Sequence, residues 1–176
     1  MNEWLVQLKD LDTKSFLDCI ETMEKNKVDI TDRSTKGEKS IQYNFYGDKT
    51  KLASYFINYI KKIENINHVV NANDVTGAWI VEGKKGSYHR LHNHSLNKKD
   101  SEYSNGLSCV LYLDVPDDEQ SEFYFLLHKG NNIECKSIQP DKGDLIIMPK
   151  SVFHGVYPQT SDGLRRTLNI DFKYAN

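Results

Sequence analysis

Along the first seventy residues, the apolar positions recur with the period of an α-helix. A first helix is predicted to begin after Asp12 and Thr13, which can cap it, and to end near residues 26 and 27. A second helix is predicted to begin after Asp48, and the polar residues 31–40 between the two indicate a loop. The apolar stripes are Phe16, Cys19, Ile20 and Met23 in the first helix, and Leu52, Tyr55, Phe56, Tyr59, Ile60 and Ile63 in the second.

From residue 75 onward the period changes from 3.6 to 2, which is the period of a β-strand. About eight short runs are separated by turns rich in Gly, Pro, Asp and Asn. Strands of this length and spacing are typical of a double-sheet jelly roll or a similar barrel, which the two helices would brace from outside. The runs are residues 75–81, 88–92, 107–113, 122–127, 133–138, 145–148, 155–157 and 167–172.

Composition narrows the class of protein. With 176 residues, 38% of them hydrophobic and 27% charged, the chain fits one ordinary soluble domain. A net charge of −2 gives no electrostatic basis for binding nucleic acid or an anionic membrane. No apolar run approaches the roughly 20 residues of a membrane span, and no signal peptide is recognisable. Because the three cysteines, Cys19, Cys109 and Cys135, have no paired spacing, we expect a reduced, cytoplasmic protein.

A stretch rich in histidine carries the candidate chemistry. Residues 86–94, Gly-Ser-Tyr-His-Arg-Leu-His-Asn-His, hold three of the six histidines. His92 and His94 are two residues apart, so an extended strand directs both to one face. A third ligand must come from elsewhere, and His154 follows the apolar run at residues 145–148. Since imidazole suits iron, zinc, copper and nickel, we predict a metal site, against the alternative of surface or satisfied core histidines.

The remaining histidines are predicted to lie outside this site. His89 has the opposite parity to His92 on the same strand, so it is expected to point away from the metal. His68, at the end of a helix, and His128, close to a turn, are expected on the surface.

The last predicted strand has one polar face. Alternation places Arg165, Thr167, Asn169 and Asp171 on that face, and Arg166 on the other with apolar residues. An arginine inside a barrel requires a partner, because an unpaired buried charge costs several kcal/mol. The partner is either Asp171 or another acid of the chain, or the carboxylate of a ligand held by the guanidinium. The alternative is one arginine on the surface and the other in a local ion pair.

Taken together, these motifs resemble a known family. In order they are residues 86–94, residues 106–114 (Gly-Leu-Ser-Cys-Val-Leu-Tyr-Leu-Asp), residues 143–154 (Gly-Asp-Leu-Ile-Ile-Met-Pro-Lys-Ser-Val-Phe-His) and residues 165–167 (Arg-Arg-Thr). The order and spacing resemble the iron(II)- and 2-oxoglutarate-dependent oxygenases, above all those with a Gly-x-Tyr-x-x-x-His-x-His stretch. The resemblance covers about residues 75–174. It implies a mainly β (α+β) fold, a double-stranded β-helix over residues 73–174, with residues 1–72 as a helical segment packing on it within a single domain of residues 1–176.

The resemblance also implies roles for individual residues. His92 and His154 match the two histidines of the family's metal triad, and His94 stands where most members have Asp or Glu. Arg165, with Thr167 two residues on, matches the pair that holds the distal carboxylate of 2-oxoglutarate, and Tyr112 matches a tyrosine that helps in some members. The implied cofactors are Fe(II), 2-oxoglutarate and O2, and the implied reaction is hydroxylation of a small molecule or peptide.

The chain departs from the family at two places, and two other functions stay open. Three neutral histidines leave the metal its full charge, and Ser121-Glu122 replaces the usual Gly-Gly. A cupin has a similar opening motif but needs a Glu shortly after His94, where Lys98 and Lys99 stand. A cupin of this kind would be a 2-oxoglutarate-independent dioxygenase, an isomerase or a binding module. A scaffold that has lost its metal is the third alternative.

Overall fold

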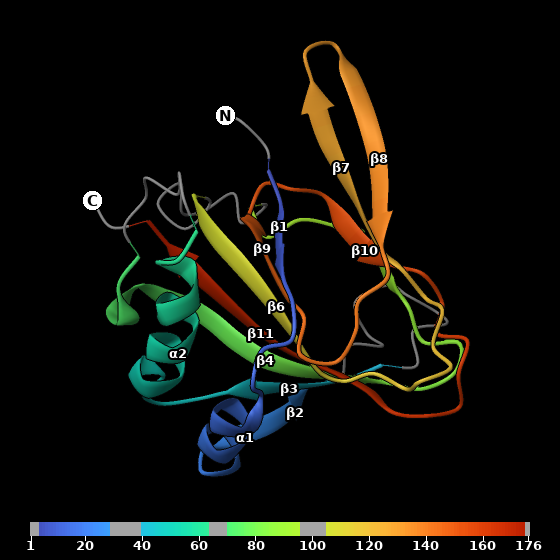
Figure 1. Ribbon diagram of the computed structural model, residues 1–176. Coiled ribbons are helices and arrows are strands. Elements are labelled where there is room, and N and C mark those ends of the chain that lie inside the picture. Colours follow the sequence, from blue (N-terminus) through green and yellow to red (C-terminus); the bar gives the residue numbers. More distant parts are fainter. Residues whose placement is uncertain (1–3, 29–39, 64–69, 96–104, 175–176) are drawn as a thin grey trace.

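Two antiparallel β-sheets face each other, and two helices cover the outside of the larger one (Figure 1). This computed structural model describes residues 4–28, 40–63, 70–95 and 105–174. The large sheet runs in the order β1 (Val6–Leu8), β9 (Leu145–Pro149), β6 (Gly106–Asp114), β11 (Arg165–Lys173), β4 (Val75–Gly83), β3 (Ile41–Phe45) and β2 (Lys25–Val28). The small sheet runs in the order β5 (His89–His92), β10 (His154–Val156), β7 (Phe123–Lys129) and β8 (Asn132–Ile138).

Strands β4 to β11 form the double-stranded β-helix that the sequence predicts. Apart from the β7–β8 hairpin, successive strands alternate between the two sheets, so β4, β6, β9 and β11 lie in the large sheet, and β5, β7, β8 and β10 lie in the small one. Each of these eight strands overlaps a run predicted from the period of 2. The β7–β8 hairpin extends beyond the barrel, as Figure 1 shows.

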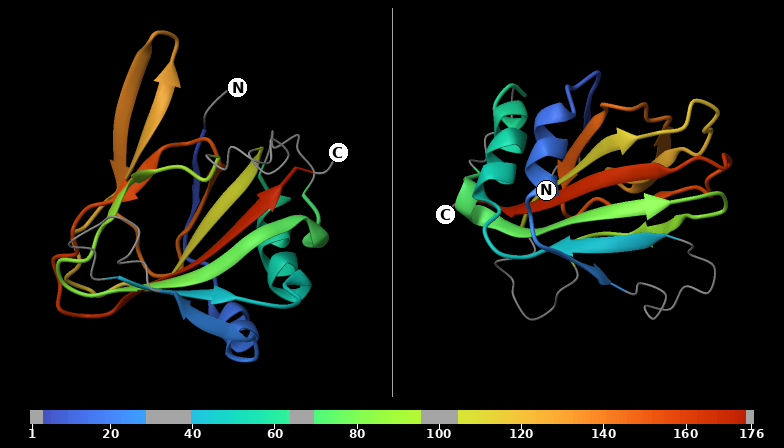
Figure 2. Two further views of the ribbon diagram at one scale, coloured as in Figure 1. Left: turned by 180° about the vertical axis from the view of Figure 1, so that it is seen from behind. Right: turned by 90° about the horizontal axis from the view of Figure 1, so that it is seen from below.

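Helices α1 (Lys14–Glu21) and α2 (Thr50–Ile60) lie side by side on the outer face of the large sheet (Figure 2). The rings of Phe16 and Phe56 meet edge to face with their centroids 4.9 Å apart. The backbone N–H of Thr50 donates to the Asp48 carboxylate at 2.8 Å, which agrees with the predicted start of the second helix. A 3₁₀ turn, η1 (Ala72–Asp74), precedes β4.

The N-terminal segment contains more than the predicted helices. Helix α1 ends at Glu21, and the stretch predicted to continue it instead forms β2, which pairs with β3. Strand β1 pairs with β9 at the opposite edge of the large sheet. The β2 sequence, Lys-Asn-Lys-Val, has no apolar period of its own, so pairing with β3 rather than local pattern decides its conformation. The predicted loop at residues 31–40 lies almost wholly outside the described residues.

The large sheet separates two apolar clusters, because its strands alternate strictly. In β6, Cys109 and Leu111 face the helices, whereas Val110 and Tyr112 face the space between the sheets. Cys19 and Cys109 are buried, while Cys135 is exposed. The outer cluster is thus the main core, and the inner one forms the wall of a cavity.

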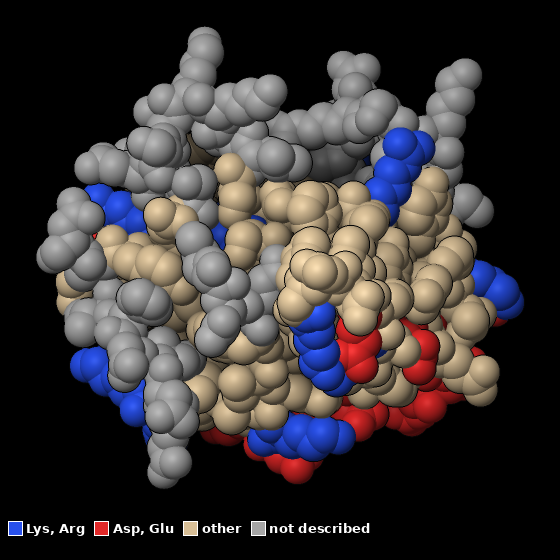
Figure 3. Space-filling view, turned by 90° about the horizontal axis from the view of Figure 1, so that it is seen from above, with Lys and Arg blue, Asp and Glu red and all other residues tan. Residues whose placement is uncertain are grey.

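The surface agrees with the small net charge. In the view from above, the described Lys and Arg side chains lie apart from one another, and acidic side chains stand beside several of them (Figure 3). In the described part of the chain, no helix has both the length and the apolar character that crossing a membrane requires.

Candidate metal centre and carboxylate pocket

The space between the two sheets holds a cavity with an empty volume of ≈ 550 Å³, which includes its open mouth. Apolar side chains from both sheets form much of its wall, and histidines and one arginine supply most of its polar groups. Tyr88 is not among the described lining residues, and residues 96–104 lie outside the described part of the chain. The lining is Trp79, Val81, Gly83, His89, His92, His94, Val110, Tyr112, Phe123, His154, Val156, Arg165, Thr167 and Asn169.

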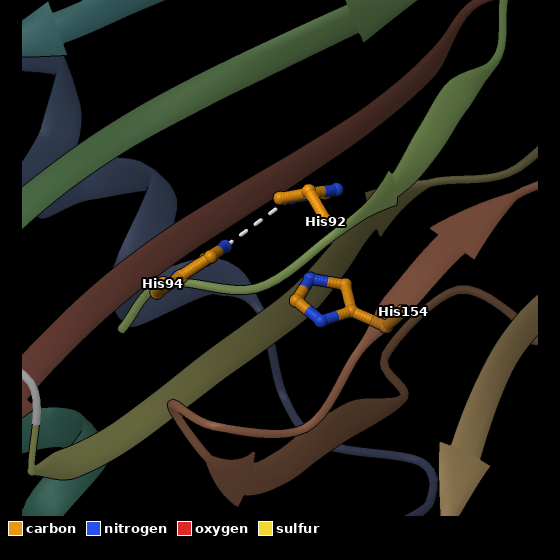
Figure 4. A group of neighbouring side chains, drawn as sticks. All are labelled: His92, His94 and His154. Atoms are coloured by element: carbon orange, nitrogen blue, oxygen red, sulfur yellow. Dashed lines mark hydrogen bonds between the residues drawn. The ribbon is translucent and has the colours of Figure 1, made fainter. Parts of the chain in front are cut away.

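Three histidines converge on one point of this cavity (Figure 4). His92 at the end of β5 pairs directly with His154 at the start of β10. His94 lies two residues past β5, where its backbone N–H donates to the Lys150 carbonyl at 2.9 Å. One ring nitrogen from each histidine lies within 4.8 Å of the others. The structure therefore brings together the three residues that the sequence predicts as metal ligands.

Hydrogen bonds at the outer nitrogens fix the tautomer of each ring. The Nδ1 atom of His92 lies 2.7 Å from the Arg90 carbonyl, and Nδ1 of His154 lies 3.0 Å from the Val152 carbonyl. Nδ1 of His94 lies 2.9 Å from both carboxylate oxygens of Asp171. Because these partners accept hydrogen bonds, each Nδ1 carries the proton, and each Nε2 is left with a lone pair.

The distances between these lone pairs fit a metal ion. The Nε2 atoms of His92 and His94 are 3.3 Å apart. Two nitrogens bound at 2.0–2.2 Å and at right angles to each other would lie about 3 Å apart. Two lone pairs at this distance repel each other unless a cation lies between them. The ligand set consequently fits a divalent ion bound from one side, with its other positions facing the cavity.

The prediction that His89 points away from this site is wrong. Val156 pairs with His89 and His154 pairs with His92, so three steps along β5 match two along β10. The extra residue is a β-bulge, which reverses the parity and turns His89 to the same side as His92. Burial, followed by the nearby His92 and Arg165, lowers the pKa of His89 to about 3. The cavity thus contains a fourth, neutral imidazole. His128 is exposed, as predicted, and His68 lies outside the described residues.

Arg165 is a buried cation without a carboxylate partner among the described residues. Its side chain lines the cavity, the residue is 6% exposed, and its Nη1 donates to the Ser121 hydroxyl. None of the ion pairs between described residues includes it. Burial lowers the pKa of Arg165, and this effect is opposed by Tyr112 and Glu119. A guanidinium in this position is suited to bind an anionic group that enters the cavity.

The two neighbouring arginines separate as strand alternation predicts. Arg166 lies on the outer face and binds Asp114 with a nitrogen–oxygen distance of 2.7 Å. Asp171, suggested by the sequence as a partner of Arg165, contacts His94 instead. Six residues along one strand correspond to about 20 Å, so Asp171 and Arg165 occupy opposite ends of β11.

Tyr112 and Thr167 lie together next to Arg165. They are register partners on β6 and β11, and both line the cavity. Burial raises the pKa of Tyr112, so its hydroxyl keeps its proton and can donate a hydrogen bond at neutral pH. Arg165, Tyr112 and Thr167 thus form one polar group in a largely apolar wall.

A network of hydrogen bonds that no sequence pattern predicted supports Arg165. The Glu119 carboxylate accepts hydrogen bonds from the backbone N–H groups of Gln120, Ser121 and Thr160 at 2.8–3.0 Å, and from the hydroxyls of Thr160 and Ser161 at 3.1 and 2.9 Å. It therefore ties the loop before β7 to the loop before β11. Burial opposes ionisation, but these hydrogen bonds outweigh it and lower the pKa of Glu119 to about 2.

Glu119 should make stability depend on pH. Its pKa rises from about 2 to its ordinary value of 4.5 on unfolding, so its contribution is complete above pH 4.5 and is lost as the pH falls towards 2. The shift corresponds to about 3 kcal/mol. Urea denaturation is expected to show a loss of that order at neutral pH in Glu119→Gln, and a smaller loss at pH 3. Asp118→Asn, at an exposed neighbour, is the control. A difference independent of pH would contradict this account.

Comparison with known proteins agrees with the geometry. Residues 77–171 match the model of the family described as "Putative 2OG-Fe(II) oxygenase". No curated protein matches the chain significantly in sequence. Among solved structures, an oxidoreductase of the 2OG-Fe(II) oxygenase family from Burkholderia pseudomallei has a TM-score of 0.69 at 13% identity, covering 96% of this chain and 85% of that one.

Two prolyl hydroxylases are also similar. The prolyl-4-hydroxylase of Pseudomonas putida has a TM-score of 0.62 at 13% identity, covering 99% of this chain and 94% of that one. The collagen prolyl hydroxylase of Paramecium bursaria Chlorella virus-1, solved with 2-oxoglutarate, has a TM-score of 0.64 at 14% identity, covering 98% and 97%. At such identities the likeness establishes the fold, whereas the family match extends over more than half of the chain. The chain therefore belongs to the 2-oxoglutarate- and iron(II)-dependent oxygenases, enzymes that use Fe(II), 2-oxoglutarate and O2.

Proposed function

We propose that this oxygenase is a hydroxylase of a small-molecule or peptide substrate, with His92, His94 and His154 as the ligands of its iron. One observation carries the proposal: three Nε2 lone pairs line the same cavity as an arginine that has no carboxylate partner among the described residues. When bound, Fe(II) and 2-oxoglutarate supply the oxidising chemistry of the family, in which O2 is consumed and 2-oxoglutarate becomes succinate and carbon dioxide. The chain itself supplies positioning and exclusion of water.

The residues at the start of β11 are assigned to the cosubstrate. Arg165 binds the distal carboxylate of 2-oxoglutarate, and Tyr112 and Thr167 donate hydrogen bonds to it. Their positions support this assignment, because all three side chains line the same cavity as the three histidines. The cosubstrate would bind the metal with its keto acid end and the guanidinium with its distal carboxylate.

The apolar wall and the imidazole of His89 are assigned to the environment of the bound cosubstrate and substrate. Val81, Val110, Phe123 and Val156 keep water away from the bound cosubstrate. His89, neutral over the physiological pH range, offers a hydrogen-bonding group without adding charge. The described lining contains no carboxylate, so it offers no negatively charged group to a cationic part of a substrate.

Anaerobic addition of Fe(II) and 2-oxoglutarate to the purified protein tests the proposal. We expect the weak visible charge-transfer band that a 2-oxoglutarate–iron chelate gives, and no band when succinate replaces 2-oxoglutarate. With O2 present, succinate should form slowly, and faster when a compound or peptide from a substrate panel is accepted. A folded, iron-loaded protein without the band would instead favour the cupin-type alternative.

A further inference from the structure

The carboxylate of Asp171 lies directly behind His94, on the side away from the other two histidines. Both of its oxygens are 2.9 Å from Nδ1 of His94, and Oδ1 accepts a hydrogen bond of 2.8 Å from the Ser108 hydroxyl. The Ser108 oxygen is in turn 3.0 Å from Nδ1 of His94. Both side chains are largely buried, with 11% of His94 and 9% of Asp171 exposed.

The fold brings these groups together from two strands, the segment that follows β5, and a turn. Asp171 and Ser108 are direct register partners on β11 and β6, and both point to the inner side of the large sheet. His94 is held above them by the hydrogen bond from its backbone to Lys150, in the turn after β9. The contact therefore depends on the barrel itself and not on any local sequence motif.

A simpler role for Asp171 would be to neutralise the buried Lys150, and the distances argue against it. Nζ of Lys150 is 3.9 Å from Oδ2 of Asp171, which is 1.0 Å longer than the contact with His94. The same Nζ lies 3.0 Å from the Thr76 hydroxyl. The carboxylate thus accepts its short hydrogen bond from the imidazole, while the distance to the Lys150 ammonium is close to the upper limit for an ion pair.

We propose that Asp171 is a positioning residue of the metal centre, which supplies through His94 the carboxylate that the ligand set lacks. The inference rests on the proposed ligand role of His94. His92, His94 and His154 would be three neutral ligands, so none of them brings a negative charge to the ion. Asp171 returns one negative charge to the centre, a single imidazole ring away from the metal.

The effect on the ligand is specific. An ionised carboxylate accepts only, so it holds the proton on Nδ1, leaves the lone pair on Nε2 and fixes the plane of the ring. An imidazole with a carboxylate behind it is also a stronger electron donor to a cation. Ser108 holds Oδ1 in place and so maintains the orientation of the carboxylate.

The test measures binding of Co(II) alone to the full chain, by competition with a chromophoric chelator, so it does not depend on 2-oxoglutarate or turnover. Asp171→Asn is expected to bind Co(II) 10–100-fold more weakly than the wild type, the usual effect of losing such a partner. The matched control is Asp144→Asn, because Asp144 is equally buried but bonds to Gln7 and to the Asp141 backbone. Its affinity for Co(II) should stay within twofold of the wild type.

A spectroscopic readout separates positioning from a merely structural role. Long-range proton–nitrogen NMR of the metal-free wild type should find His94 protonated at Nδ1, and Asp171→Asn should shift the population towards the Nε2-protonated form. Ser108→Ala, a milder variant, should weaken Co(II) binding by a smaller factor and keep the tautomer. The wild-type tautomer can be measured even if Asp171→Asn does not fold.

The outcomes distinguish this inference from the proposed function. If the wild type does not bind Co(II), the ligand assignment itself fails. If the wild type binds and Asp171→Asn binds equally well, or His94 is protonated at Nε2 in the wild type, only the role of Asp171 is overturned. An equal loss of Co(II) affinity in Asp144→Asn would likewise overturn the role of Asp171, since replacing any buried carboxylate would then have the same effect.

Discussion

Replacing His154 by alanine is expected to abolish stoichiometric metal binding while leaving the protein folded. His154 is 4% exposed and supplies one of the three converging nitrogens, so the variant keeps two ligands and gains a small cavity. Binding energies of about 10–16 kcal/mol for four-ligand zinc sites imply roughly 3 kcal/mol for each ligand. The dissociation constant should therefore rise by at least about 100-fold. His92→Ala should behave in the same way.

Metal analysis after equilibration with a fixed concentration of free Fe(II) or Co(II) checks this expectation. The matched control is His128→Ala, since His128 lies exposed on the β7–β8 hairpin. Circular dichroism and thermal unfolding establish that each variant is folded. Full occupancy in either ligand variant would refute the assignment of that histidine, and loss of metal in His128→Ala would point to a general effect of the substitution.

Replacing Arg165 by alanine is expected to remove 2-oxoglutarate binding and leave metal binding intact. The guanidinium is buried and has no carboxylate partner in the described part of the chain, so the ligand's distal carboxylate would be its main counter-charge. Truncating one partner of a buried charge pair costs about 2–5 kcal/mol. This range corresponds to a dissociation constant higher by about 30-fold to several thousand-fold.

The adjacent residue provides the control. Arg166 is an arginine on the same strand, but it faces outward and pairs with Asp114. Arg166→Ala should therefore keep 2-oxoglutarate binding, measured by anaerobic titration of the charge-transfer band or by calorimetry with the metal-loaded protein. Equal affinity for 2-oxoglutarate in Arg165→Ala and the wild type would exclude Arg165 from the cosubstrate site. This conclusion would hold whether or not the three histidines are the metal ligands.

The fold was predictable from sequence wherever hydrophobic period and burial agree. Strand β11 illustrates this, because its apolar residues Leu168, Ile170 and Phe172 face the helices. Its polar residues Arg165, Thr167 and Asn169 line the cavity. Strand β2 was not predictable, because Lys25, Asn26 and Lys27 are exposed at a sheet edge and carry no periodic signal.

The site was predictable to a similar degree. The i, i+2 spacing of His92 and His94, and a third histidine after a buried strand, were sufficient to nominate the three histidines that the structure brings together. Strand alternation gave the wrong direction for the His89 side chain, because a single extra residue in β5 reverses the direction of every side chain beyond it. A bulge of this kind depends on pairing with β10 and has no local signature.

The sequence by itself determined which residue types face inward, and so established the barrel class, the histidine motif and the separation of Arg165 from Arg166. These are consequences of local alternation, which each strand carries in its own residues. Only the tertiary structure decided that Asp171 forms a hydrogen bond with His94 and does not pair with Arg165. It also decided that Ser121 and Glu119 support the guanidinium, and that the side chain of His89 lines the cavity. Contacts of this kind join residues up to 77 positions apart, and strand register and a bulge determine them.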